Sequence, residues 1–142
     1  MTLLRFDTVS KQYPSGQKAL DALSFQVQAG EMLFITGHSG AGKSTLLKLA
    51  HLSERPSQGS VWFNGKNLNT LRGDRVALHR RQLGVVHQDH CLLLDRTVFD
   101  NVALPLRIAG LSPTEIRNRV HHALESLGLA ERANARSTDI SS

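Results

Sequence analysis

A glycine-rich segment in the first third of the chain carries residue types that hold phosphate. It reads Gly37-His38-Ser39-Gly40-Ala41-Gly42-Lys43-Ser44-Thr45 and fits the pattern G-x-x-x-x-G-K-[ST]. Glycines let backbone N–H groups converge on phosphate oxygens, where a Cβ would obstruct them. We expect Lys43 to reach the β- and γ-phosphates as a mobile point charge, and the Ser44 hydroxyl to bind Mg²⁺. The segment therefore predicts a binding site for a nucleoside triphosphate.

Two flanking elements must position this loop. The apolar run from Met32 to Thr36 predicts a strand that leads into it, and Leu46-Leu47-Lys48-Leu49-Ala50 predicts a helix that leads out. The positive end of that helix would face the same anion as the loop. The alternative, a glycine-rich turn with a chance lysine, leaves this strand–loop–helix order unexplained.

Other segments have recognisable local signals. Apolar runs between turn residues predict strands at Leu4 to Val9, Leu20 to Val27 and Val61 to Phe63, with turns at Pro14-Ser15-Gly16 and Asn64-Gly65.

The second half of the chain reads as mostly helical. Residues 75–82 predict a helix and residues 83–86 a short buried strand. A longer helix should begin at the capping box Ser112-Pro113-Thr114-Glu115 and stop at Gly128. Residues 133–142 are polar and unpatterned, so we expect a loose tail there.

Composition limits the class of protein. The chain has 142 residues, of which 40% are hydrophobic and 20% charged, as in a soluble one-domain protein. No apolar run is long enough to span a membrane, and the N-terminus lacks the apolar stretch of a signal peptide. The lone Cys91 excludes an internal disulfide framework and fits a reducing compartment.

The basic charge admits several partners. A net charge of +5 would suit nucleic acid, an acidic membrane surface or anionic nucleotides. The basic residues are spread along the chain, and the local cluster at residues 78–81 has no interleaved aromatic residues. A solvated basic face is thus favoured over specific nucleic-acid binding.

Several stretches together resemble one family. An N-terminal tyrosine, the phosphate loop and a later strand ending in glutamine occur in the order typical of ATP-binding-cassette (ABC) ATPases. Residues 38–49, Glu54-Arg55-Pro56, Phe63-Asn64-Gly65 and residues 88–105 resemble, more narrowly, the FtsE-type ATPases of bacterial cell division. The resemblance runs from about residue 3 to about residue 135. The phosphate loop is shared by the whole superfamily, and the stretch around Gln88 narrows the resemblance to the FtsE type.

The resemblance implies roles for particular residues. Tyr13 would stack on the adenine of ATP, and Gln88 would position Mg²⁺ and the attacking water. An uncharged amide can accept from water and bind a metal without adding charge. From the residues alone, Tyr13 could instead be a strand-end tyrosine packed on the sheet, and Gln88 an ordinary surface residue.

The resemblance also implies partners. Residues 89–106 would hold a membrane subunit resembling FtsX, although the same apolar residues could serve ordinary packing of the helical part. A second ATPase subunit would complete an ATP sandwich. These partners would place the chain in the cytoplasm, at the inner face of the bacterial inner membrane.

Some residues imitate sites that we do not expect. Leu92-Leu93-Leu94-Asp95 resembles a Walker B strand, but Arg96 follows where the catalytic glutamate belongs, so Asp95 is interpreted as a loop residue. Ser15-Gly16-Gln17 faintly resembles an ABC signature but lies in the first hairpin. A zinc site is not expected at His87, His90 and Cys91, which lack a fourth ligand, or at His121 and His122, which point apart on a helix.

The later motifs of the family do not occur in these residues. The sequence after residue 88 contains no Leu-Ser-Gly-Gly-Gln signature, Walker B pair or switch histidine. The expected fold is therefore α/β, the N-terminal part of a P-loop ABC nucleotide-binding domain. It should hold an antiparallel β subdomain, the loop with its strand and helix, and part of the helical subdomain, over residues 1–135. Residues 136–142 would be a divergent tail, and the parallel core sheet would be incomplete.

Without those motifs, nucleotide should bind but turn over poorly. The alternative function is a non-catalytic nucleotide-binding remnant or an inert gene fragment. A GTPase or small-molecule kinase is disfavoured, because Asn64-Gly65-Lys66-Asn67 is not the guanine motif and no arginine cluster marks a kinase lid.

Overall fold

A computed structural model describes residues 1–89 and 91–139 of the chain. The chain divides into two compact units, Met1–Gly84 and Val85–Ser142.

The first unit is built on a four-stranded antiparallel sheet with the strand order β2-β1-β3-β4. The strands are β1 (Thr2–Gln12), β2 (Lys18–Gln28), β3 (Gln58–Phe63) and β4 (Lys66–Asn67). Phe6 pairs with Phe25 on one side and Val61 on the other, and the two phenylalanine rings stack with centroids 4.7 Å apart. Aromatic and β-branched cross-strand pairs of this kind stabilise a sheet. The predicted antiparallel β subdomain is confirmed.

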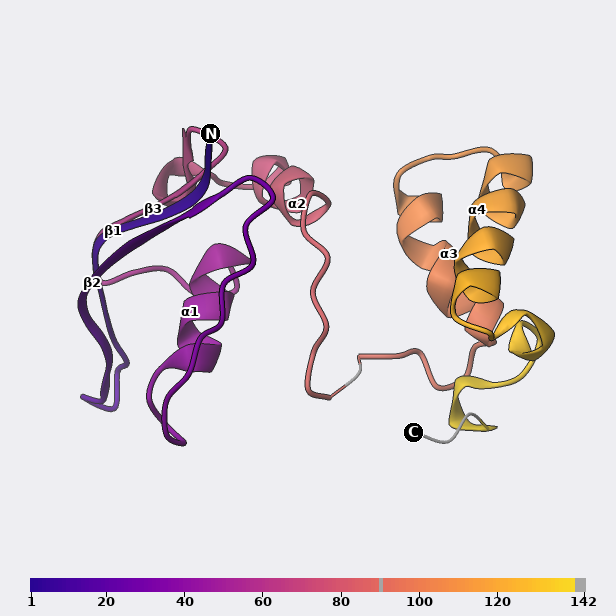
Figure 1. Ribbon diagram of the computed structural model, residues 1–142, viewed down its shortest axis with the longest axis horizontal. Helices are drawn as coiled ribbons and strands as arrows, with labels where there is room; N and C mark the ends of the chain where they lie inside the picture. Colours follow the sequence, from indigo (N-terminus) through magenta and orange to yellow (C-terminus); the bar gives the residue numbers. More distant parts are fainter. Residues whose placement is uncertain (90, 140–142) are drawn as a thin grey trace. The chain divides into compact units, whose positions relative to one another are not determined.

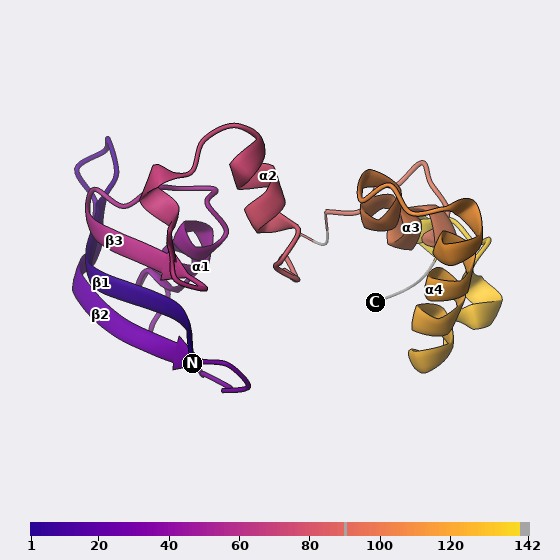
Figure 2. The same ribbon diagram turned by 90° about the horizontal axis from the view of Figure 1, so that it is seen from above.

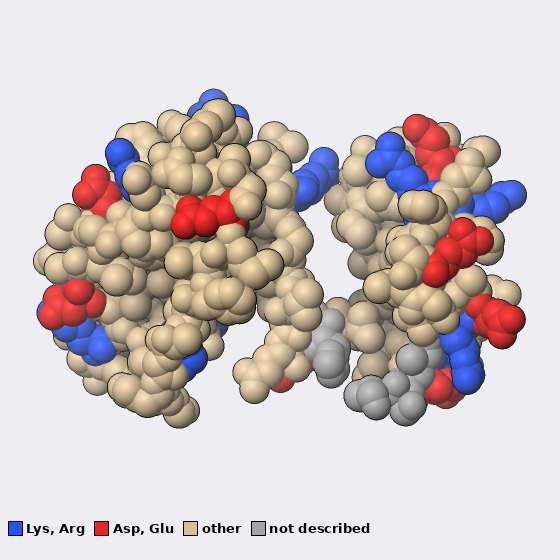
Figure 3. Space-filling model, viewed as in Figure 1, with Lys and Arg blue, Asp and Glu red and all other residues tan. Residues whose placement is uncertain are grey.

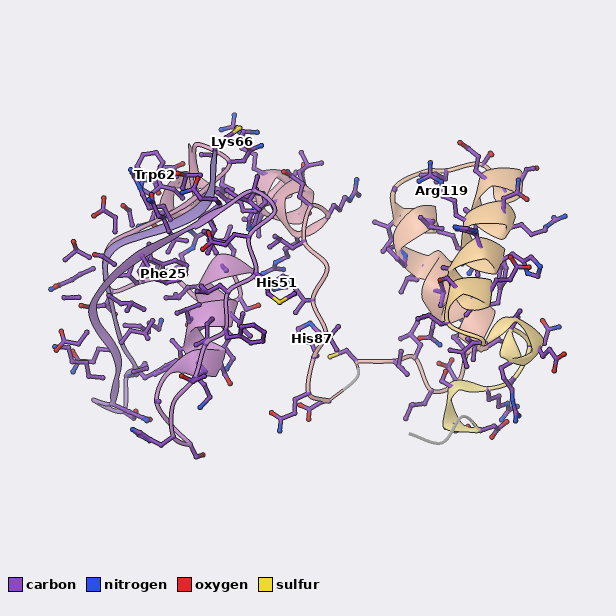
Figure 4. All side chains as sticks on the ribbon, in the orientation of Figure 1. Phe25, His51, Trp62, Lys66, His87 and Arg119 are labelled. Atoms are coloured by element: carbon purple, nitrogen blue, oxygen red, sulfur yellow. The ribbon has the colours of Figure 1, made fainter. Side chains whose placement is uncertain are left out.

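The Asn64-Gly65 hairpin is also confirmed. Both residues have positive φ angles, 48° and 75°, and Phe63 pairs with Lys66 across the turn. A two-residue turn with positive φ at both positions matches the twist of the adjoining strands. Figure 4 shows Lys66 at this turn and Trp62 on the side of the sheet away from α1.

Helix α1 (Lys43–Ala50) packs on one face of this sheet, as Figures 1 and 2 show. Leu46 and Leu49 face the sheet, while Leu47 and Lys48 are exposed. This spacing is that of an amphipathic helix with one buried stripe. The buried core of the unit consists of Phe6, Val9, Leu20, Leu46, Leu49, Leu52, Val61 and Leu68.

A second helix, α2 (Asp74–Arg80), holds the far end of α1, following the short 3₁₀ turn η1 (Leu68–Thr70). His79 is only 3% exposed, and its Nε2 lies 2.8 Å from the Ala50 carbonyl. Because a carbonyl only accepts, Nε2 must carry the proton. Arg80 donates to the carbonyls of His51 and Leu52. These contacts satisfy carbonyls that a helix end leaves unpaired.

The second unit is a helical hairpin. It contains α3 (Val98–Ile108), α4 (Pro113–Ser126) and the 3₁₀ turns η2 (Ala130–Arg132) and η3 (Ser137–Asp139). Ser112 caps α4 in a capping box with Glu115, as predicted, and Gly128 follows the helix with a φ of 69°. The buried residues are Val98, Ala103, Ile116, Val120 and Leu124.

Two predicted strands are wrong. Residues 32–36 pair with no described segment, and Met32 and Phe34 are each 79% exposed. Residues 83–86 are likewise unpaired, and Val86 is 98% exposed. An apolar run becomes a strand only where another strand supplies its hydrogen bonds, and among the described residues none does so here.

The predicted loose tail is wrong for residues 133–139. The Ala135 and Ala133 carbonyls accept from the backbone N–H groups of Val98 and Phe99 at the start of α3. The Ser137 hydroxyl donates toward the Leu93 and Arg96 carbonyls, at 3.1 and 2.9 Å. The segment thus satisfies N–H groups that the start of α3 leaves open, which composition alone did not reveal. Residues 140–142 lie outside the described part.

Candidate functional site

The phosphate loop has a backbone that needs glycine. Gly40 and Gly42 have φ angles of 82° and 89°, which L side chains rarely adopt. At Gly42 there is also no room, because an added Cβ would collide with the Ala19 carbonyl oxygen and lie 2.9 Å from Leu20 Cδ2. The start of β2 therefore packs directly against the loop and fixes its position.

The Lys43 ammonium is folded into this loop. Its Nζ donates to the Gly37 carbonyl at 2.6 Å and to the His38 carbonyl at 2.7 Å. An ammonium has three N–H groups, so one remains for an anion. The carbonyls of the loop thus hold the Lys43 ammonium in a fixed position.

The start of α1 adds backbone donors. The helix begins at Lys43, directly after Gly42, which has no side chain to cap it. The first-turn N–H groups of a helix lack intrahelical partners, and the helix dipole makes this end positive. Both effects favour an anion at the mouth of the loop.

An open pocket of about 530 Å³ lies over these groups. Its walls bring together residues from the first hairpin, the loop and the first turns of α1. They are Tyr13, Gln17, Ala19, Ser39, Gly40, Ala41, Gly42, Lys43, Ser44, Thr45 and Lys48. The wall includes the cations of Lys43 and Lys48, and no Asp or Glu is among these described lining residues. Of the predicted loop residues, Gly37 and His38 do not line the pocket and act through their carbonyls on Lys43.

Tyr13 reaches this pocket from the end of β1. Its hydroxyl lies 3.2 Å from Thr45 Oγ1 on α1. The side chain is half-buried, and Thr45 is buried. A tyrosine distant in sequence is therefore joined to the end of the phosphate loop, and its stacking on adenine stays a prediction.

Sequence reasoning missed three lining residues. Lys48 carried a usable signal, because it lies four residues after Ser44 and so on the same helix face. Gln17 and Ala19 carried none, because only the pairing of β1 with β2 brings them to the loop.

The remaining predicted site residue, Gln88, belongs to the second unit. Gln88 is exposed in a turn before α3, and its role at Mg²⁺ stays a prediction. Asp95 lies in a turn, as expected of a loop residue, and Ser15-Gly16-Gln17 lies in the hairpin connection. His121 Nε2 lies 3.4 Å from a Glu125 carboxylate oxygen. His90 lies outside the described residues.

The segment predicted to hold a partner exposes apolar side chains. Leu92, Leu93 and Leu94 are 49%, 44% and 61% exposed. Asn101 supports this loop, because its amide accepts from the Leu93 N–H at 2.8 Å and donates to the Leu93 and Thr97 carbonyls at 3.0 Å. The exposed leucines therefore sit on a fixed backbone.

The charged side chains do not form a patch of one sign on the face drawn in Figure 3, where basic and acidic side chains are interspersed over each unit. Within residues 1–89 and 91–139, no helix combines the length and the apolar character that crossing a bilayer requires.

Comparison with known proteins agrees with this geometry. The sequence profile of the family described as "ABC transporter" matches residues 20–142. The cell division ATP-binding protein FtsE of Escherichia coli K12 is 54% identical over 131 residues, which is 92% of this chain and 59% of that protein. The methionine import ATP-binding protein MetN of Thermobifida fusca is 47% identical over 117 residues, 82% of this chain and 36% of that protein.

A solved structure matches as well. The dimeric, post-hydrolysis ATP-binding cassette MJ0796, bound to ADP and Pi, superposes with a TM-score of 0.89 at 30% identity, covering 98% of this chain and 63% of that one. The chain thus spans about six-tenths of the length of the FtsE relatives it matches. Together with the phosphate loop and the antiparallel sheet that positions it, these matches show that the chain belongs to the ABC transporter family.

Proposed function

We propose that this chain binds Mg-ATP in the pocket over the phosphate loop. The observation that carries the proposal is the Lys43 ammonium held inside a glycine loop at the uncapped start of α1. A pocket with two lysines and helix N–H groups suits a polyphosphate. Family membership supports ATP as the nucleotide.

The residues of the proposed site would contact different parts of Mg-ATP. Residues 37–45 would cradle the phosphates, and Lys43 would pair with the β- and γ-phosphates. Tyr13 would stack on adenine by its flat ring. Ser44 is exposed at the pocket and Gln88 offers an amide oxygen, and both are the hard oxygen ligands that suit Mg²⁺. When bound, Mg²⁺ would neutralise charge on the β- and γ-phosphates.

We further propose that the chain is the ATP-binding part of an FtsE-like complex in bacterial cell division. Its membrane partner would resemble FtsX and dock on residues 89–106, at the inner face of the inner membrane. The FtsE likeness and the exposed leucines of that segment support this. MetN relatives make a transport complex the competing assignment, but two MetN relatives are 47% and 41% identical, against 54% for the FtsE of Escherichia coli. A second ATPase subunit would complete the site, as the dimeric relative suggests.

Hydrolysis by these 142 residues should be slow. The described pocket wall offers cations and N–H donors but no carboxylate to orient or activate water. The alternative, a nucleotide-binding remnant, shares the binding site and differs only in lacking turnover.

Titration of the purified chain with Mg-ATP tests the binding proposal. Lys43→Ala should weaken binding at least about tenfold, because it removes a charged hydrogen-bonding group from the phosphates. Lys66→Ala at the distant hairpin is the matched control and should leave the dissociation constant unchanged. Equal affinity of the wild-type chain and Lys43→Ala would refute the phosphate site.

Phosphate release measured on the same proteins tests turnover. The wild-type chain should release phosphate no faster than Lys43→Ala. A rate that depends on Lys43 would show that the chain completes catalysis by another route.

Co-purification with an FtsX-type membrane subunit tests the partner. Leu94→Asp should abolish capture, whereas Leu127→Asp, at a leucine outside the segment that is also mostly exposed, should not. Capture that survives Leu94→Asp, or a MetN-type partner bound in preference, would overturn the assignment.

A further inference from the structure

Lys11 does not line the pocket but contacts Tyr13, which does. We infer that Lys11 is a positioning residue for the base-binding ring of Tyr13, and that it raises affinity for the nucleoside part of the ligand. The inference rests on the proposed nucleotide site. Lys11 is not among the lining residues, so it would not touch a nucleotide directly, and its short-range effect would act through Tyr13.

The Lys11 ammonium is held firmly. Its Nζ donates to a Glu54 carboxylate oxygen at 2.8 Å and to the Arg55 carbonyl at 2.9 Å. The side chain is only 12% exposed, so solvent screens these contacts little. A lysine in this state is a fixed charge rather than a mobile surface group.

That fixed charge lies over the Tyr13 ring. Nζ is 5.1 Å from the ring centroid, within the range of a cation–π contact. Tyr13 lines the pocket, whereas Lys11 does not. The proposal therefore places Lys11 on one face of the ring and a flat base on the face toward the pocket.

The rest of Tyr13 is fixed by other contacts. Its backbone is pinned in the hairpin turn, where its N–H donates to the Gln17 carbonyl at 2.9 Å and its carbonyl accepts from the Gly16 N–H at 2.9 Å. Its hydroxyl meets Thr45 Oγ1 at 3.2 Å. Lys11 supplies the remaining restraint, on the plane of the ring.

A ring that is already oriented lowers the entropic cost of stacking a base upon it. Removing Lys11 should therefore weaken ATP but not a ligand that lacks a base. Mg-tripolyphosphate is such a ligand, because it can use the phosphate loop alone. The ratio of the tripolyphosphate dissociation constant to that of ATP isolates the contribution of the nucleoside, and long-range charge effects largely cancel in it.

The test measures both dissociation constants by calorimetry on the full chain. Lys11→Met keeps the aliphatic stem and removes the charge, and it should lower the ratio about three- to tenfold, the scale of a partly buried cation–π contact. The tripolyphosphate constant should stay within about twofold, which also shows that the loop is intact. Lys18→Met is the control, since Lys18 is an exposed strand lysine paired with Asp21.

A second readout follows the ring directly. Tyr13 is the single tyrosine of the chain, so isotope-labelled tyrosine gives one set of ring resonances. Lys11→Met should shift and broaden them in the free protein, whereas Lys18→Met should not. Glu54→Gln keeps the Lys11 charge but loosens its anchor, so it should lower the ratio in the same direction and to a smaller extent.

The outcomes separate the two proposals. A ratio unchanged in Lys11→Met, or in Glu54→Gln should Lys11→Met fail to fold, overturns the positioning role. So does an equal weakening of both ligands, because it would mean a general structural effect. A wild-type chain that binds neither ligand contradicts the proposed nucleotide site itself.

Discussion

Replacing Gly42 by alanine should lower the stability of the first unit. The loss should exceed that of a glycine-to-alanine change at a position with a similar positive φ but with free space for the new Cβ. The φ of 89° alone costs an alanine about 1–2 kcal/mol. The new Cβ would also collide with the Ala19 carbonyl oxygen and approach Leu20 Cδ2 to 2.9 Å. Since the nearest atom is backbone, β2 or the loop must move, and overpacking of this kind costs about 1–3 kcal/mol more.

Gly16→Ala separates the two contributions. Gly16 has a similar φ of 83°, but an added Cβ there meets nothing within 4 Å. It should therefore show only the conformational cost of about 1–2 kcal/mol, whereas Gly42→Ala should lose about 2–5 kcal/mol in total.

Urea unfolding followed by Trp62 fluorescence measures both variants. Trp62 is the single tryptophan and lies in β3 of the same unit, so the signal reports on the sheet that holds the loop. Nucleotide affinity of Gly42→Ala should also fall at least about tenfold, because the N–H groups no longer converge. Equal destabilisation by Gly16→Ala and Gly42→Ala would refute the close approach of β2 to the loop.

Three other predictions concern the second unit and the exposed apolar run. Asn101→Leu should cost about 1–3 kcal/mol and remove hydrogen-exchange protection from the Leu93 amide, since the amide side chain bonds both groups of Leu93; protection that persists would contradict this support. Hydrogen bonds from the Ser112 hydroxyl and backbone hold the pKa of Glu115 below its ordinary value of 4.5. The ionised Glu115 carboxylate should therefore stabilise the fold above pH 4.5, and this contribution should be lost as the pH falls through the lower pKa of the folded state. In Glu115→Gln, the free energy of unfolding should depend less on pH over this range, as unfolding curves at several pH values would show. An equal pH dependence in the wild-type chain and the variant would contradict the link. Phe34→Lys should reduce self-association in light scattering, because it places a charge in an unpaired apolar run; a wild-type chain that is already monodisperse would contradict the expectation.

Local signals in the sequence anticipated local structure well. The capping box at Ser112, the Asn64-Gly65 turn and the helix over residues 46–50 all lie where residue type and spacing placed them, although α1 already begins at Lys43. Each depends on hydrogen bonds or φ angles within a few residues, so neighbouring residues suffice to determine it.

Paired structure could not be anticipated in the same way. Residues 32–36 have a strand-like composition, but strand formation depends on a partner elsewhere, and the described residues supply none. Residues 133–139 have no pattern of their own, yet they are ordered by the open N–H groups at the start of α3.

The sequence alone was enough to predict a phosphate-binding loop in this protein, because the glycines, Lys43 and Ser44 are contiguous in the chain. Tertiary structure decided what surrounds that loop. The pairing of β1 with β2 brings Gln17 and Ala19 to the pocket, and the Thr45 contact joins Tyr13 to α1. Lys11 gains its fixed charge only because Glu54 and the Arg55 carbonyl, far along the chain, fold beside it. These contacts arise from burial and pairing between distant segments, which no local spacing encodes.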